Sequence, residues 1–126
     1  MKKLLLLLSL FIGLTLTTIA QRGERIEALK IAFITERLSL DSKTAEKFWP
    51  IYNQYEVEMR AFMQQRKKGN DDLSAEDMLE NEQKALDIKK KYAPQFLKVI
   101  SNDQLSNLYR AEKDFRQMII RKMKKG

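Results

Sequence analysis

Ile100-Ser101-Asn102-Asp103-Gln104 stands near the end of this 126-residue chain and opens a predicted helix. The Ser101 hydroxyl can accept a hydrogen bond from the amide of Gln104, whose side chain can reach back to the Ser101 amide. Such a capping box satisfies two backbone donors that the first turn of a helix leaves unpaired. A related stretch, Leu40-Asp41-Ser42-Lys43-Thr44, lies 60 residues earlier and lacks the glutamine.

Apolar side chains recur at comparable distances after the two stretches. The first set is Ala45, Phe48, Trp49, Tyr55 and Met59, and the second is Leu105, Leu108, Tyr109, Phe115 and Ile119. Self-similarity at a fixed distance is typical of a repeated supersecondary unit. The chain is therefore predicted to contain two related helix pairs.

The hydrophobic periodicity is helical throughout, and no segment shows the alternation of a strand. We therefore expect an all-α fold of four elongated helices. Their predicted bounds are Arg22 to Leu38, Asp41 or Ser42 to Lys68, Ser74 to Val99, and from just after Ser101 to Lys122, with Gly69-Asn70-Asp71-Asp72 as a connecting loop.

Pro50 and Pro94 both fall inside helical patterns. A proline within a helix removes an N–H donor and clashes with the preceding turn, so each is predicted to kink its helix. In an antiparallel hairpin the two kinks would come at nearly the same level. The alternative is that Pro50 follows a separate first turn.

The second predicted helix carries the longest apolar stripe, at alternating spacings of three and four residues. Four helices form few layers, so part of such a stripe is expected to stay exposed unless a second chain covers it. The alternative is simple core packing. The candidate binding residues on this stripe are Trp49, Tyr52, Tyr55, Met59, Phe62 and Met63.

Residues 1–20 combine a basic start, an apolar stretch from Leu4 to about Leu16, and small or polar residues before Ala20. This arrangement predicts a signal peptide that is cleaved after Ala20, leaving residues 21–126 as one domain. An uncleaved anchor is the alternative. Because the chain has no Cys, helix packing or oligomerisation must supply the stability that small secreted domains often take from disulfides.

Without Lys2 and Lys3 the chain has 22 basic and 17 acidic residues, and most of the excess lies in Arg110–Gly126. Such a basic end attracts anionic surfaces. Outside the cytoplasm these would be lipid head groups or acidic stretches of unfolded protein, and no nucleic acid is expected. The alternative is a solvated helix end that complements its own dipole. The basic candidates are Arg116, Arg121 and Lys122.

Catalysis is not expected, because the chain has neither His nor Cys and the helix starts account for Ser42, Ser74 and Ser101. The same absences predict no transition-metal site and no cofactor. The alternative is a hard-cation site formed by Asp71, Asp72, Glu76 and Asp77. These residues lack the regular ligand spacing of a calcium loop.

At the two helix starts the chain resembles the Spy/CpxP family of small periplasmic helical proteins, whose hallmark is a repeated Leu-Thr-x-x-Gln motif. Ile100, Ser101 and Gln104 fit that motif with two conservative changes, whereas Leu40, Asp41 and Ser42 form a degenerate copy. The resemblance implies a curved antiparallel homodimer in the periplasm that binds unfolded or misfolded envelope proteins without ATP. Metal-sensing relatives use His ligands, which this chain lacks.

Three hypotheses follow from the sequence. The first is an ATP-independent holdase, in which basic side chains speed capture and apolar ones hold the client. The second is a regulatory partner of a membrane-bound stress-signalling protein, such as a two-component sensor or an anti-sigma factor. The third is a structural dimer that buries its stripes completely.

Overall fold

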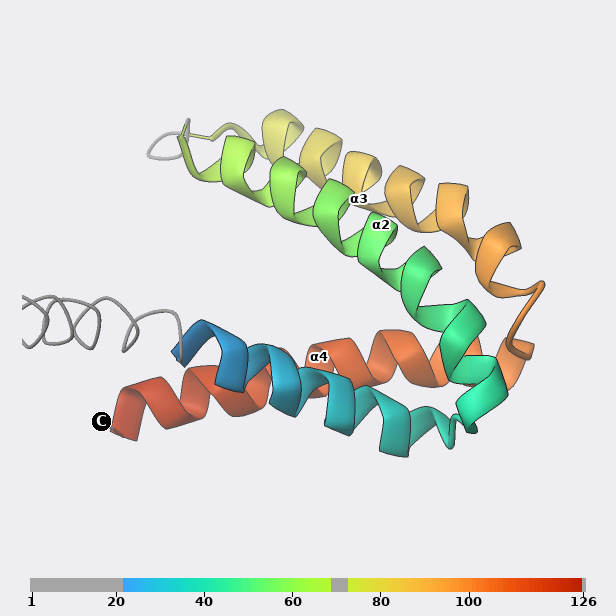
Figure 1. Cartoon of the computed structure of the whole chain (residues 1–126). Coiled ribbons are helices and arrows are strands. Elements are labelled where there is room, and N and C mark those ends of the chain that lie inside the picture. The colour runs from blue at the N-terminus through green and yellow to red at the C-terminus, as the bar shows by residue number, and fades with distance from the viewer. Residues whose placement is uncertain (1–21, 69–72, 126) are drawn as a thin grey trace, which may run out of the picture. The chain divides into compact units, whose positions relative to one another are not determined.

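The computed structural model describes residues 22–68 and 73–125, which form helices joined by short turns and contain no strand (Figure 1). A helix covers residues 22–38 and is followed by α2 (Ser42–Lys68), α3 (Ala75–Phe96) and α4 (Asn102–Lys125). The predicted all-α fold is thus confirmed. The predicted signal peptide and the loop at 69–72 lie outside the described residues.

Side-chain caps fix the starts of the three later helices. Before α3, Ser74 accepts a bond from the Asp77 amide and its own amide donates to the Asp77 carboxylate. Before α2, the cap is Asp41, which accepts a bond of 2.7 Å from the Thr44 amide. The prediction that Ser42 is a cap is wrong, because Ser42 is already the first residue of α2.

The ends of α3 and α4 differ from their predicted places by three residues, whereas the first helix and α2 end where predicted. α3 ends at Phe96 because the amides of Val99 and Ile100 both turn back to the Phe96 carbonyl, at 2.9 and 2.8 Å. α4 continues beyond Lys122 to Lys125. Pro50 and Pro94 lie inside α2 and α3, and α2 has no separate first turn before Pro50.

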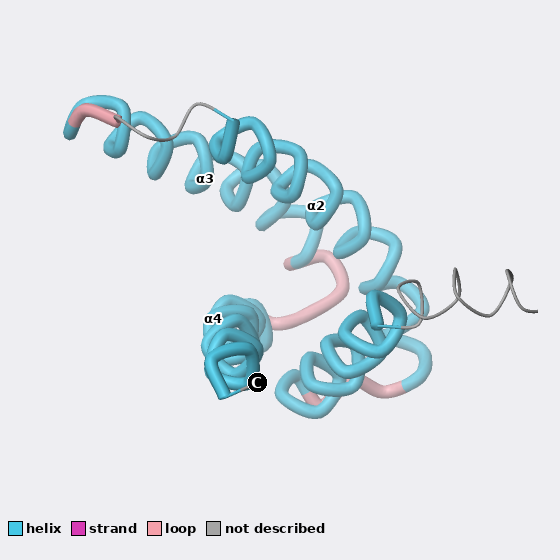
Figure 2. Tube along the Cα trace, turned by 90° about the vertical axis from the view of Figure 1, so that its left-hand side faces the viewer, coloured by secondary structure: helices cyan, strands magenta, loops and turns pink. Residues whose placement is uncertain are grey.

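The described chain divides into two compact units. Residues 38–110 form the central unit, and residues 22–37 with 111–125 form the terminal unit, so that α4 contributes to both. In the central unit α2 and α3 lie side by side and antiparallel, as both ribbon views show (Figures 1 and 2). A short turn then leads from α3 to α4.

Aromatic side chains form the core of the central unit. Phe48 stacks on Tyr52 at 5.6 Å and contacts Phe96 across the hairpin at the same centroid distance. Tyr55 meets Tyr92 and Phe96 edge-on, both at 5.8 Å. Aromatic pairs in these geometries contribute about 0.5–1.5 kcal/mol beyond the burial of their area. The apolar stripe of α2 is therefore tied to α3 along its first half.

The terminal unit is a pair of antiparallel helices with a smaller core. Phe33 packs against Phe115 at 5.7 Å, and Ile34 is also buried. Arg37 lies over the Phe33 ring at 4.7 Å and forms an ion pair of 3.0 Å with Asp114. Both charged side chains of this pair are almost half exposed, so the pair adds little to stability.

Candidate functional site

The predicted client-binding stripe on α2 divides into a buried and a partly exposed half. Tyr52 and Tyr55 are 1% and 2% exposed, which supports the core alternative for both, so we remove them from the candidate surface. Trp49 is half-buried, and its ring packs edge-on against Phe48 and Tyr52. The first half of the stripe therefore holds the hairpin together and offers little surface to a partner.

Beyond Tyr55 the stripe opens toward solvent. Met59 and Phe62 are half-buried, and Met63 is exposed. On α3, Met78 is exposed as well. These four residues, the hairpin-end surface, belong to the halves of α2 and α3 that flank residues 69–72. Methionine is flexible and polarizable and adapts to differently shaped partners. Met78 lies at helical spacing from the buried Tyr92 and Phe96, but it is exposed.

A second apolar surface on α3 was not predicted. Leu79, Leu86 and Leu97 are all exposed, and we call them the leucine row. Successive members of the row are 7 and 11 residues apart, so their side chains project from the helix at nearly the same angle, within about 20° of one another. Leu97 keeps the helical conformation, with φ −67° and ψ −11°. The row lies about 120° around the helix from the buried Tyr92. The helical spacing of these three leucines is the sequence signal that predicts the row.

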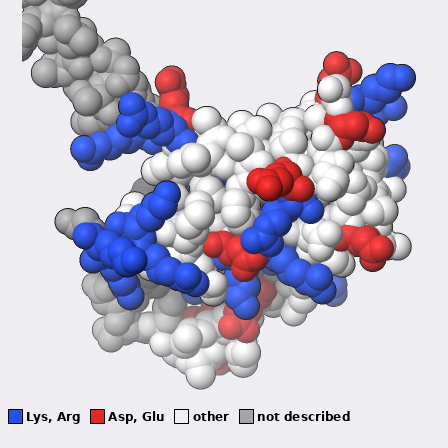
Figure 3. Space-filling model, turned by 90° about the horizontal axis from the view of Figure 1, so that it is seen from below, with Lys and Arg blue, Asp and Glu red and all other residues white. Residues whose placement is uncertain are grey.

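The structure does not bring the basic candidates onto one side of α4. Arg116, Arg121 and Lys122 are all exposed. Arg121 and Lys122 follow Arg116 by five and six residues, which places them about 140° and 120° from it around the helix. The three side chains therefore cannot line a single face. Basic residues do gather at the end of α4, where Lys122, Lys124 and Lys125 occupy the last turn (Figure 3).

The second capping stretch does more than cap its helix. Ser101 donates its amide to Gln104 Oε1 at 2.9 Å, and the Gln104 amide donates to Ser101 Oγ at 3.1 Å, which confirms the predicted capping box. The Gln104 amide nitrogen Nε2 also donates to the carbonyl oxygen of Leu38 at 3.0 Å. This contact satisfies a carbonyl at the end of the first helix. It joins residues 66 apart, and the local sequence contains no signal for it.

The first capping stretch also caps its helix, but through different side chains. Its cap is Asp41, and hydrogen bonds from the amide and side chain of Thr44 hold the pKa of Asp41 below its ordinary value of 3.8. The carboxylate also complements the positive end of the helix dipole. Thr44 stands where the second copy has Gln104, and its shorter side chain bonds to Asp41 three residues away. Leu40 and Ile100 precede the two caps as predicted.

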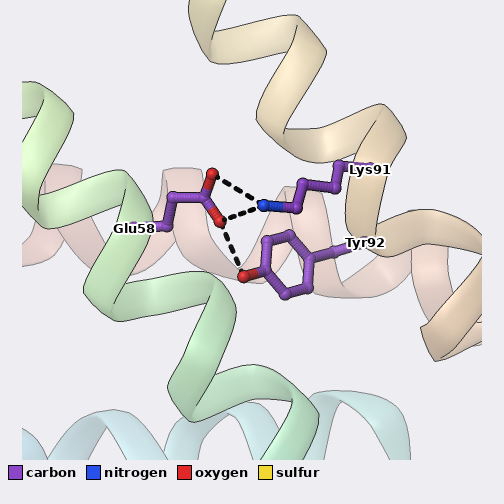
Figure 4. Close-up of polar contacts among 3 residues, drawn as sticks. All are labelled: Glu58, Lys91 and Tyr92. Carbon is purple, nitrogen blue, oxygen red and sulfur yellow. Dashed lines mark hydrogen bonds and ion pairs between the residues drawn. The ribbon is translucent and has the colours of Figure 1, made fainter.

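One polar cluster joins the two helices of the hairpin (Figure 4). The Glu58 carboxylate of α2 accepts a bond of 2.7 Å from the Tyr92 hydroxyl and lies 3.1 Å from Lys91 Nζ. The bond from Tyr92, followed by that from Lys91, lowers the pKa of Glu58, whereas the bond to Glu58 raises the pKa of Tyr92. The three side chains satisfy one another's hydrogen-bonding groups, as is typical of a structural contact, and we call this cluster the clamp between α2 and α3. Asp87, which lies four residues before Lys91 on the same helix, instead accepts a bond of 2.9 Å from Gln83 Nε2.

Within residues 22–68 and 73–125, no group of three acidic, His or Cys side chains is arranged to hold a metal ion. Asp77, one member of the alternative cation site, caps α3, and Asp71 and Asp72 lie outside the described residues. Over the same ranges, none of the helices combines the length and apolar character needed to cross a bilayer.

Comparisons with protein-family models, curated proteins and solved structures gave no match to this chain. The resemblance to the Spy/CpxP family therefore rests on the two capping stretches and stays a prediction.

Proposed function

We propose that this protein is an exported, ATP-independent holdase of the periplasm that binds unfolded or misfolded envelope proteins. The observation that carries the proposal is the exposure of large apolar side chains in both units of a small chain. Within residues 22–68 and 73–125, eleven such residues are exposed, among them Met63 and Met78 at the hairpin end and the three leucines of the row. Exposed apolar side chains that gather on one surface mark sites where proteins bind other proteins.

The hairpin-end surface is the part suited to hold a client. Met59, Phe62, Met63 and Met78 combine partial burial with soft, adaptable side chains, so the surface can accept many apolar segments without a fixed shape. Partial burial also limits how tightly a segment is held, because only the exposed part of each side chain gains from contact. Weak and reversible binding is what a holdase without ATP requires.

The basic terminal unit is the part suited to speed capture. Residues 22–37 and 111–125 contain ten Lys or Arg and five Asp or Glu, whereas residues 38–110 contain twelve of each. The three basic candidates, Arg116, Arg121 and Lys122, project from different sides of α4. Long-range electrostatic attraction does not require charged side chains to share a face. We therefore assign these three residues to the steering of acidic client segments and not to a surface that holds the client.

We also propose that the protein is a homodimer that pairs along the leucine row. Charge along α3 favours an antiparallel arrangement of two copies, because the acidic start of one helix then lies beside the basic end of the other. Leu79 of one copy would meet Leu97 of the second, and such an isologous contact closes as a dimer. The acidic residues are Glu76, Asp77, Glu80 and Glu82, and the basic residues are Lys89, Lys90 and Lys98.

Sedimentation velocity tests the dimer. Leu79→Ser/Leu86→Ser/Leu97→Ser should sediment as a monomer at concentrations where the wild type is a dimer. Val57→Ser is the matched control, since Val57 is 66% exposed on α2 and belongs to neither surface. A monomeric wild type, or a leucine variant that remains dimeric, would exclude this interface.

An aggregation assay tests the holdase itself. Purified residues 21–126 should suppress the aggregation of two unrelated unfolding proteins at near-stoichiometric ratios without ATP. Met63→Ser/Met78→Ser should weaken protection while the helical circular dichroism signal is kept, because both side chains are exposed. If a folded wild type protects neither protein, the holdase is excluded. A dedicated regulator of a membrane-bound signalling protein then becomes the better account.

A further inference from the structure

α4 carries a second, outward face in addition to its core stripe. Lys113, Arg116, Ile120 and Met123 follow one another at spacings of three, four and three residues, and Lys124 adjoins them. Ile120 is 53% exposed and Met123 is 71% exposed, and the three basic residues are exposed as well. We call these five residues the α4 outer face.

The geometry of a helix separates this face from the core. Phe115 is buried against Phe33, and Ile120 follows five residues later, about 140° around the helix. Ala111, which is fully buried, likewise marks the inner side. The outer face therefore stays available when the terminal unit is folded.

The charged members of this face are all basic: Lys113, Arg116 and Lys124, with the two apolar side chains between Arg116 and Lys124 along the helix. The half-buried Glu112 lies at the edge of the face, about 20° around the helix from Met123. Lys113 and Lys124 are separated by about 16 Å of helix axis. A partner that fits must therefore present anionic groups at both ends and an apolar medium between them.

We propose that the α4 outer face docks on an anionic phospholipid surface. There the basic side chains reach phosphate groups with their ends while their stems lie along the apolar boundary, and Ile120 and Met123 enter the region between head groups and acyl chains. An acidic peptide supplies the charges but no apolar layer beneath them, so the bilayer interface is the better match. With only two apolar residues the attachment is reversible and sensitive to salt.

Vesicle co-sedimentation tests this proposal independently of holdase activity. Residues 21–126 should bind vesicles of phosphatidylglycerol and phosphatidylcholine at a ratio of one to two, and should not bind pure phosphatidylcholine. Each basic residue near an anionic bilayer raises binding roughly fivefold. Lys113→Gln/Arg116→Gln/Lys124→Gln should thus lower the affinity on the order of a hundredfold.

The matched control removes the same charge elsewhere. Lys43→Gln/Lys47→Gln/Arg66→Gln neutralises three exposed basic residues of the central unit and should lower the affinity by less than about threefold, as screened distant charges would. A control loss as large as that of the outer-face variant would overturn the proposal. So would equal binding to the two kinds of vesicle.

A second variant separates lipid docking from general attraction to polyanions. Ile120→Ser/Met123→Ser keeps every charge and should weaken vesicle binding several-fold, while binding of a polyglutamate peptide stays unchanged. If this variant binds the vesicles as tightly as the wild type, the face does not enter the bilayer interface and the proposal is wrong. Circular dichroism of each variant confirms that the helices remain.

Discussion

The central and terminal units differ in what they bury and in what they carry. The central unit is neutral in formal charge and is held by a network of aromatic rings across α2 and α3. The terminal unit has an excess of five basic residues and a short core around Phe33, Ile34 and Phe115. Packing energy and charge are therefore concentrated in different parts of this chain. Substitutions in the two units should therefore have separable effects.

The largest expected effect comes from the aromatic core. Phe48 is fully buried and contacts three other rings, so Phe48→Ala should lower the free energy of unfolding by about 3–5 kcal/mol. Met123→Ala in the terminal unit should change it by less than about 0.5 kcal/mol, because that side chain is exposed. Urea titration followed by circular dichroism measures both. Similar losses in the two variants would remove the contrast between the units.

The two functions of Gln104 can be separated by a pair of variants. Ser101→Ala removes the cap acceptor and should cost about 1 kcal/mol. Gln104→Glu keeps an oxygen for the Ser101 amide but loses the Nε2 donor to Leu38, so it should also cost about 1 kcal/mol. Each should lower the melting temperature by about 4–8 °C. Gln117→Ala, an exposed position on α4, is the control. An unchanged Gln104→Glu would mean that the contact with Leu38 is not formed in solution.

A smaller effect should appear in the dependence of stability on pH. Glu58 has a lowered pKa in the folded protein, so its contribution is present above its unfolded value of 4.5 and is lost as the pH falls through the lowered value. Tyr92 has a raised pKa, so its contribution is present below 10.0 and is lost as the pH rises through the raised value. Melting curves from pH 3 to 11 should show both losses in the wild type.

Glu58→Gln should flatten both ends of this pH profile. Glu80→Gln is the matched control, because it removes an ion pair to Lys84 on the surface of a single helix. If the profiles of the wild type and Glu58→Gln are parallel, the clamp between α2 and α3 adds nothing to stability.

Local rules predicted the parts of the fold that depend on neighbouring residues. The capping box of Ser101 and Gln104 and the four helices follow from hydrogen-bonding chemistry and periodicity within a few turns. Contacts between distant segments were missed, such as Gln104 with Leu38 and Lys91 with Glu58, because both require knowing which helices pack together.

The candidate site was predicted less well than the fold. Apolar residues at helical spacing are equally compatible with core and surface, so the stripe on α2 could not reveal that Tyr55 is buried and Met63 exposed. Leu79, Leu86 and Leu97 follow a helical period of their own on α3, about 120° from the buried Tyr92, and were not predicted as a surface. Only the packing partner decides which of two apolar faces remains exposed.

Capture kinetics tests most directly the claim that the terminal unit steers a client and the central unit holds it. Stopped-flow fluorescence with a labelled, unfolded acidic protein separates the association rate from the dissociation rate. Arg116→Glu/Arg121→Glu/Lys122→Glu should slow association at least tenfold at low salt and leave dissociation unchanged, whereas Met63→Ser/Met78→Ser should speed dissociation and leave association unchanged. The account is contradicted if both variants alter the same rate constant, or if the wild type does not bind the client.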